Sequence, residues 1–166
     1  YIRAIRWASD RIGNAGIIGF VTNAGWLEAN TADGLRKCLA EEFSSIHVFH
    51  LRGNQRTSGE LSRTEGGKIF GSGSRAPIAI SLLVKNPHAN QHGQIRFHDI
   101  GDYLSREEKL EKVAAFASVN GFPHWQNITP DTHGDWLNQR DDSFGEFIVL
   151  GDKRSDDLKL FDNFSM

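Results

Sequence analysis

Ile17-Ile18-Gly19-Phe20-Val21-Thr22 is a short apolar run with almost no polar alternation. Such a run is typical of a strand that is buried on both faces of a parallel sheet. The apolar residues before it recur at helical spacing: Tyr1, Ile5, Ala8 and Ile12. Gly13 to Gly16 can then end this helix in the left-handed conformation. The chain therefore predicts a helix that leads directly into a buried strand.

The alternation of helix and strand continues downstream. Thr31 is a candidate N-cap for a second helix, whose apolar face comprises Leu35, Cys38, Leu39 and Phe43. Ile46 to Leu51 and Pro77 to Val84 are further apolar runs, and Gln94 to Ile100 alternates as a half-exposed strand should. This order predicts an α/β fold.

The last third of the chain predicts a helix and little else that is regular. Ser105 and Glu108 form a capping box, and the helix that follows has Leu110, Val113, Ala114 and Ala117 at helical spacing. Beyond Gly121 the sequence becomes loop-like and acidic. Two late strands are expected, at 144–150 and 158–161.

Composition narrows the class of protein. The chain has 166 residues, one cysteine and no apolar run of membrane-spanning length. We expect one domain in a reducing compartment, the cytoplasm. The only methionine is Met166, so we expect a piece of a longer polypeptide. Residues 1–86 carry 11 Lys and Arg against 7 Asp and Glu, whereas residues 87–166 carry 8 against 14. The basic half could face a polyanion, although solvated surface charge explains the same numbers.

The segment 52–76 is far longer than an ordinary connection between strands. It contains six glycines and two acidic residues, so we expect it to be mobile. Its basic residues are the candidates for DNA contact: Arg52, Arg56, Arg63, Lys68 and Arg75.

Two common site types are not indicated. Gly66 to Gly73 is rich in glycine, but it leads into a strand, whereas a phosphate-binding loop opens a helix. His47 and His50 point to opposite faces of a strand, and His88 and His92 lack partners at zinc spacing. We therefore expect neither nucleotide binding by this loop nor a metal site.

Phe70 and Asn23 are the individual candidates. An exposed Phe70 in the basic loop could stack on an unpaired base, or it could cap the edge of the core. Asn23 follows the first strand at the sheet edge where α/β proteins bind ligands, or it is a simple turn residue.

These segments together resemble the second half of a gamma-type amino-methyltransferase, the class that methylates adenine N6 in DNA with S-adenosylmethionine. In that family a helix after Asn-Pro-Pro-Tyr leads to a strand with a polar end, here Gly16-Ile-Ile-Gly-Phe-Val-Thr-Asn23. A later loop carries an aromatic residue ahead of a strand, here Phe70 and Pro77-Ile-Ala-Ile-Ser-Leu-Leu-Val-Lys85. The resemblance implies that Phe70 packs against a flipped adenine.

A closer resemblance is to type ISP restriction-modification enzymes, which join a nuclease, a translocase, a methyltransferase and a target-recognition domain. Asn127 to Arg140 is similar to their junction after the methyltransferase core, and Leu160 to Ser165 to the start of the next region. The resemblance implies a partial Rossmann-like methyltransferase sheet over residues 1–103 and an α+β extension toward target recognition over 104–166. It also implies double-stranded DNA and the remaining domains of the polypeptide as partners.

The departures from the family pattern are informative. The glycine-rich cofactor motif and Asn-Pro-Pro-Tyr are absent from these residues. We therefore expect S-adenosylmethionine in the full-length enzyme but no cofactor and no catalysis in this chain alone. A non-catalytic nucleic-acid-binding or coupling module and an interaction domain with a disordered loop remain as alternatives.

Overall fold

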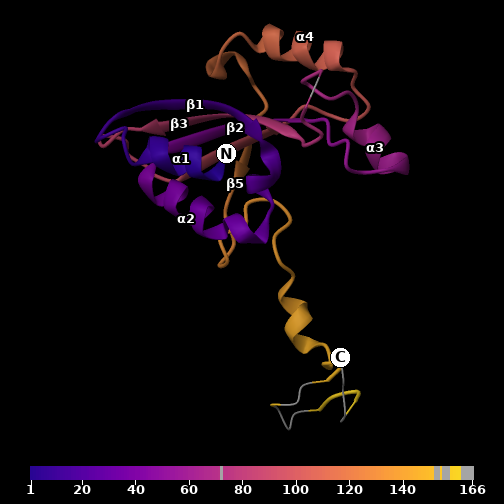
Figure 1. The fold of residues 1–166 in the computed structure, drawn as a ribbon. Coiled ribbons are helices and arrows are strands. Elements are labelled where there is room, and N and C mark those ends of the chain that lie inside the picture. The colour runs from indigo at the N-terminus through magenta and orange to yellow at the C-terminus, as the bar shows by residue number, and fades with distance from the viewer. Residues whose placement is uncertain (72, 152–153, 155–157, 162–166) are drawn as a thin grey trace.

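Five strands form one mixed sheet in the order β1-β3-β2-β4-β5 (Figure 1). The computed structural model describes residues 1–71, 73–151, 154 and 158–161. The strands are β1 (Gly16–Asn23), β2 (Ser45–Arg52), β3 (Ile78–Lys85), β4 (Gln94–Asp99) and β5 (Gln126–Ile128). β2 is parallel to β4, β3 is antiparallel to β1 and β2, and β5 is antiparallel to β4. β1 and β2 therefore run in the same direction, with β3 reversed between them.

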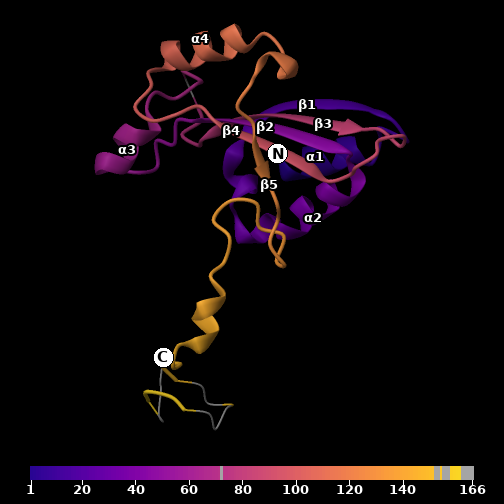
Figure 2. The same cartoon turned by 180° about the vertical axis from the view of Figure 1, so that it is seen from behind.

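Helices cover the two faces of the sheet unequally (Figures 1 and 2). α1 (Ile2–Ser9) and α2 (Asp33–Glu42) lie on one face, and α4 (Arg106–Phe116) lies over the other. α3 (Gly59–Glu65) belongs to the connection between β2 and β3. Four short 3-10 helices complete the described helices: Ala24–Leu27, Asn30–Ala32, Val119–Gly121 and Asp142–Glu146.

The main core lies between the sheet and the pair α1 and α2. Ile5 of α1 and Leu39 of α2 pack there against strand residues such as Val48 and Leu83. Apolar burial of this kind is the main favourable contribution to folding. A smaller core on the opposite face packs rings under α4, with Phe49 and Trp125 4.6 Å apart between ring centroids.

A buried ion pair ties the loop after β5 to the main core. The Arg36 side chain is fully buried and pairs with Asp135, which is 3% exposed. Its guanidinium also donates to carbonyl oxygens of Trp26 (2.9 Å), Ala29 (2.8 Å) and Gly134 (3.0 Å). Because a buried charge is tolerated only when it is paired and hydrogen-bonded, this network fixes the loop. Trp136 then packs edge-on against Trp26, with ring centroids 5.4 Å apart.

Much of the predicted order is confirmed. Strands occur at 45–52, 78–85 and 94–99, close to the predicted ranges, and the fold is mixed α/β. The capping box is complete, since Ser105 Oγ accepts from the Glu108 N–H at 3.3 Å and Glu108 Oε2 accepts from the Ser105 N–H at 2.7 Å.

The prediction for the first strand was wrong in its burial. β1 pairs only with β3 in the described structure, and its residues alternate between half-buried and exposed. Ile17 is 71% exposed and Val21 is 56% exposed. The physical reason is that no described helix covers this face of β1, and no described strand pairs with its outer edge.

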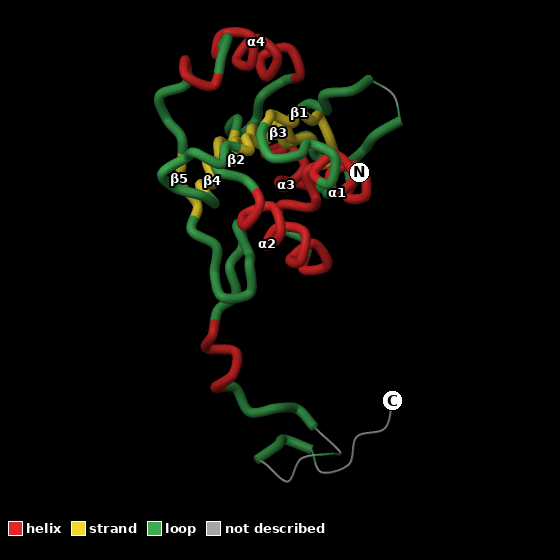
Figure 3. Tube along the Cα trace, turned by 90° about the vertical axis from the view of Figure 1, so that its left-hand side faces the viewer, coloured by secondary structure: helices red, strands yellow, loops and turns green. Residues whose placement is uncertain are grey.

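Other boundaries also differ. Thr31 does not cap α2, which begins after Ala32 without a side-chain cap, and α1 ends at Ser9 rather than Ile12. The late strands at 144–150 and 158–161 are absent from the described residues, where one bridge joins Val149 and Lys159. This segment extends away from the sheet (Figure 3). Most of the stretch Leu160 to Ser165 lies outside the described residues. The predicted boundary after residue 103 stays a prediction, although the later residues supply β5 to the same sheet.

None of the described helices is both long enough and apolar enough to span a membrane.

Replacing Asp135 by Asn tests the buried ion pair. Removing one partner leaves the Arg36 charge buried and uncompensated, so we expect the free energy of unfolding to fall by about 3–5 kcal/mol. Urea unfolding measures this. The matched control is Asp10→Asn, which breaks an exposed pair with Arg6 and should change stability little. Equal, small losses in both variants would contradict the role given to Asp135.

Candidate nucleic-acid interface

A polar pocket of about 610 Å³ lies at the carboxyl end of β1. Open α/β sheets bind their ligands at this edge. Four asparagines contribute to its wall: Asn23, Asn30, Asn54 and Asn138. Arg56, Glu28 and Tyr1 also line it. The pocket therefore presents amide groups, one guanidinium and one carboxylate.

Asn23 is held in place by the turn that follows β1. Its Oδ1 accepts a hydrogen bond from the Gly25 N–H at 2.7 Å and caps the 3-10 helix Ala24–Leu27. The side chain thus serves the turn and lines the pocket at once. The two roles proposed for Asn23 are compatible.

Arg56 reaches the same pocket from the connection after β2. The Arg56 N–H donates to Asn54 Oδ1 at 3.0 Å, and the Asn54 N–H donates to Glu65 Oε2 at 2.9 Å. The Arg56 side chain is exposed, and its guanidinium has no partner among the described residues. The fold therefore brings two of the predicted site residues, Asn23 and Arg56, to one pocket.

The other basic candidates differ in whether their side chains already pair with acidic or carbonyl groups of the chain. Arg52 donates to Asp99 Oδ1 at 2.7 Å and also pairs with Asp102, and these carboxylates raise its pKa despite burial. Arg75 donates to the Gln55 carbonyl at 2.7 Å, and Arg63 lies 3.4 Å from Glu60. Lys68 is half-buried. Neither Arg56 nor Lys68 has a side-chain partner among the described residues, and of the two Arg56 is the exposed one. DNA contact by all five stays a prediction.

A buried lysine fixes the glycine-rich part of the segment 52–76. Lys109 on α4 is fully buried, and its Nζ donates to the carbonyls of Glu65 (2.7 Å) and Gly67 (2.8 Å). One turn earlier, Arg106 Nε donates to the Ile69 carbonyl at 2.8 Å. Burial lowers the pKa of Lys109 to about 8. Three carbonyls within the stretch 65–69 are therefore attached to one helix.

Glycine is required where the loop meets this helix. Gly66 has φ of +68°, and a Cβ there would lie 2.2 Å from the Leu104 oxygen. A Cβ on Gly67 would lie 2.5 Å from the Arg106 nitrogen. No side chain fits at these distances, so the loop passes backbone to backbone over the start of α4.

This attachment decides how Phe70 is presented. Ile69 is 7% exposed and joins the smaller core, whereas Phe70 is 47% exposed. Ile69 therefore anchors the loop and leaves the Phe70 ring half-exposed. The segment contains α3 and is held by Lys109 and Arg106, and its expected mobility stays a prediction.

Lys109 was not predicted, because the spacing of Leu110, Val113, Ala114 and Ala117 places the expected buried face of α4 elsewhere. Lys109 is buried and Val113 and Phe116 are half-buried, whereas Leu110 is 40% exposed. The available signal was a lysine spaced four and seven residues from apolar side chains on one helical face. The described residues contain no group of three or more His, Cys, Asp or Glu able to hold a metal.

Similar proteins occur among solved structures. A nuclease-deletion mutant of the Type ISP restriction-modification enzyme LlaGI, in complex with a DNA substrate mimic, is 50% identical over 92% of this chain (TM-score 0.84). The ATP-dependent Type ISP restriction-modification enzyme LlaBIII, bound to DNA, is 43% identical over 95% (TM-score 0.86). A DrdV–DNA complex is 32% identical over 91% (TM-score 0.79).

The chain spans 14%, 10% and 14%, respectively, of the lengths of these three solved proteins. No family model and no curated protein matches it.

Replacing Lys109 by Met should release the loop while keeping the helix apolar. The carbonyls of Glu65 and Gly67 lose their buried donor, so amide exchange over 67–71 should accelerate roughly ten- to a hundredfold. Hydrogen exchange with mass spectrometry measures this. Lys112→Met is the control, because Lys112 Nζ donates to the Ile100 carbonyl and not to the loop. Unchanged exchange in Lys109→Met would show that the loop is held by other contacts.

The pKa of Lys109 gives a pH dependence. It lies at about 8 in the folded chain against 10.5 as its ordinary value, so the unfolded chain binds more protons between these limits. The contribution of Lys109 to the free energy of unfolding therefore rises with pH through that window. Calorimetry should show the Tm of the unsubstituted chain rising relative to Lys109→Met from about pH 8 to about pH 10.5. A difference that does not change with pH would contradict the lowered pKa.

Proposed function

We propose that this chain is the later part of a DNA adenine-N6 methyltransferase domain within a restriction-modification enzyme. The observation that carries the proposal is the amide-rich pocket at the carboxyl end of β1, beside the edge of β1 with which no described strand pairs. The similar solved proteins include two Type ISP restriction-modification enzymes, and all three are complexes with DNA or a DNA mimic. These complexes support DNA as the partner of the whole enzyme.

The path of the chain supports a missing strand beside β1. The chain runs from β1 at the edge of the sheet through α2 to the parallel strand β2, which lies two positions further into the sheet. α2 lies on the same face of the sheet as α1. Crossovers between parallel strands almost always have the same hand. A strand before α1 and parallel to β1 would thus lie on the opposite side of β1, at its open edge.

This geometry supports a shared active site. In the methyltransferase family, Asn-Pro-Pro-Tyr stands just before the helix that corresponds to α1. A strand ending in that motif would have its carboxyl end beside Asn23 and the pocket. The exposed Ile17 and Val21 are the side chains that such a neighbouring part of the domain would cover.

The residues of this chain do not fit S-adenosylmethionine by themselves. The backbone of Leu104 to Arg106 fills the space beside Gly66 and Gly67, so these glycines leave no room for a ligand. In the whole enzyme, S-adenosylmethionine held by residues outside this chain would supply the methyl group. The part played by this chain would then be to bind and orient the DNA.

Base flipping gives Phe70 and Arg56 distinct roles. Adenine N6 cannot be reached for methyl transfer within the base stack, so the base must leave the duplex. The half-exposed Phe70 ring would stack on the flipped adenine. Because its loop is already anchored by Lys109, less conformational entropy would be lost when the ring stacks. Arg56 would contact a phosphate, a contact that positions the duplex without reading its sequence.

The two roles predict different defects in the full-length enzyme. Phe70→Ala should lower the methylation rate about 5- to 150-fold, since an aromatic contact with a base is worth about 1–3 kcal/mol, and should leave duplex affinity nearly unchanged. Arg56→Ala should weaken binding to every sequence and reduce its salt dependence. Single-turnover methylation and fluorescence anisotropy measure the two effects.

Melting each variant controls for stability. Full methylation by a stably folded Phe70→Ala enzyme would remove the stacking role. A non-catalytic nucleic-acid-binding module would be favoured by a different result. In that case the unsubstituted full-length protein would transfer no methyl group, and both substitutions would abolish DNA binding.

A further inference from the structure

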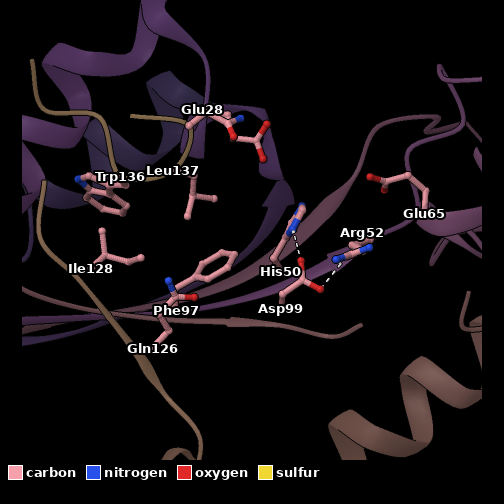
Figure 4. A pocket seen from close by; sticks show the side chains of 11 residues that line it. Glu28, His50, Arg52, Glu65, Phe97, Asp99, Gln126, Ile128, Trp136 and Leu137 are labelled. Atoms are coloured by element: carbon pink, nitrogen blue, oxygen red, sulfur yellow. Dashed lines mark hydrogen bonds and ion pairs between the residues drawn. The ribbon is translucent and has the colours of Figure 1, made fainter. Parts of the chain in front are cut away.

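A second pocket of about 500 Å³ opens at the carboxyl ends of β2 and β4 (Figure 4). Its floor is apolar and includes Phe97 and Trp136, which are 7% and 3% exposed. Its rim carries the carboxylates of Glu28, Glu65 and Asp99. The proposed roles of Phe70 and Arg56 leave this pocket unused.

The central polar group of this pocket is a buried imidazole with one unused nitrogen. His50 is 8% exposed, and its Nδ1 lies 3.3 Å from Asp99 Oδ2. Asp99 also accepts from Arg52 Nε at 2.7 Å and from the Gly101 N–H at 2.8 Å, which holds the pKa of its carboxyl far below the ordinary range despite burial. Asp99 Oδ2 can accept the Nδ1 proton of His50, and in that tautomer Nε2 is an acceptor. No described residue donates to Nε2, and Figure 4 shows the ring rising from β2 toward the space bordered by Glu28 and Glu65.

Backbone strain accumulates around the same pocket. Arg52 lines it with φ of +55°, a region that an arginine rarely adopts, and Asn138 lines it with φ of +46°, which asparagine tolerates better. Strain of this kind persists where the surrounding contacts enforce it, and it clusters at ligand sites. Arg52 pairs with Asp99 and Asp102, and no described basic side chain pairs with the Glu28 carboxylate, whereas Glu65 Oε2 already accepts from the Asn54 N–H at 2.9 Å.

The chemistry of the wall selects the ligand. His50 Nε2 and the carboxylates of Glu28 and Glu65 all accept hydrogen bonds, and the one arginine of the lining is already paired. The net negative charge repels phosphate and attracts a cation. A planar, weakly hydrated cation with several N–H donors fits both the acceptors and the apolar floor.

We propose that this pocket binds the guanidinium group of an arginine side chain from a protein segment outside this chain. His50 Nε2 and Glu28 accept its N–H donors, and the apolar part of the arginine lies over Phe97 and Trp136. The inference does not depend on the proposed methyltransferase function. It makes the carboxyl ends of β2 and β4 a protein contact that adjoins the amide-rich pocket at β1 and shares Glu28 and Asn138 with it.

Titration with Nα-acetyl-arginine amide tests this proposal, with NMR of the His50 ring as the readout. We expect saturable shifts of the ring signals at low salt. Nα-acetyl-citrulline amide, the neutral isostere, should bind at least about tenfold more weakly, because it lacks the charge-assisted bonds. Inorganic phosphate should cause no shift.

Substitutions locate the binding group. Glu28 is exposed, so the Glu28→Gln variant should fold normally, and it should bind the arginine amide several-fold more weakly. The control is Glu41→Gln, at an exposed position of α2, which should leave the binding unchanged. Equal binding of the arginine and citrulline compounds, binding of phosphate, or no response of His50 to the arginine compound would each overturn the proposal.

Discussion

The hydrogen bonds of the buried Lys109 ammonium group determine how far the Phe70 side chain is exposed. The ammonium group donates to two carbonyls of the segment between β2 and β3, and Arg106 adds a third contact on the same helix. A charge without exposure to water is stable only when its donors are used. The helix and the loop therefore have to fold together, and the loop emerges from this contact with Ile69 inward and Phe70 half-exposed. Glycine at positions 66 and 67 is the steric condition for the same approach.

The local elements followed from the sequence because their signals are local. The Ser105 and Glu108 capping box and the apolar runs that became β2 and β3 depend on neighbouring residues. The burial of β1 could not be predicted from the sequence. An apolar run looks the same whether this chain or another part of a larger domain covers its second face. α3 was missed because its seven residues contain little apolar periodicity and none is buried.

The candidate site was predictable in part for the same reason. Asn23 and Arg56 were each recognisable from their place in the sequence, but their meeting in one pocket depends on the reversed strand β3 and on the hydrogen bonds around Asn54. Arg52 pairs with Asp99, the last residue of the parallel strand β4, and with Asp102 just after it, 47 and 50 residues along the chain. The charge balance of Arg52 could therefore not be predicted from the loop alone. The fold thus separates Arg52, whose charge is paired with two carboxylates, from Arg56, whose exposed guanidinium has no partner among the described residues.

Crosslinking tests most directly whether the anchored loop faces the target base. DNA with 5-iodouracil in place of the target adenine would be irradiated on the full-length enzyme, and the attached peptide identified by mass spectrometry. The account predicts attachment at Phe70, because a stacked ring lies in contact with the substituted base. Attachment confined to residues outside the segment 66–76 would contradict it.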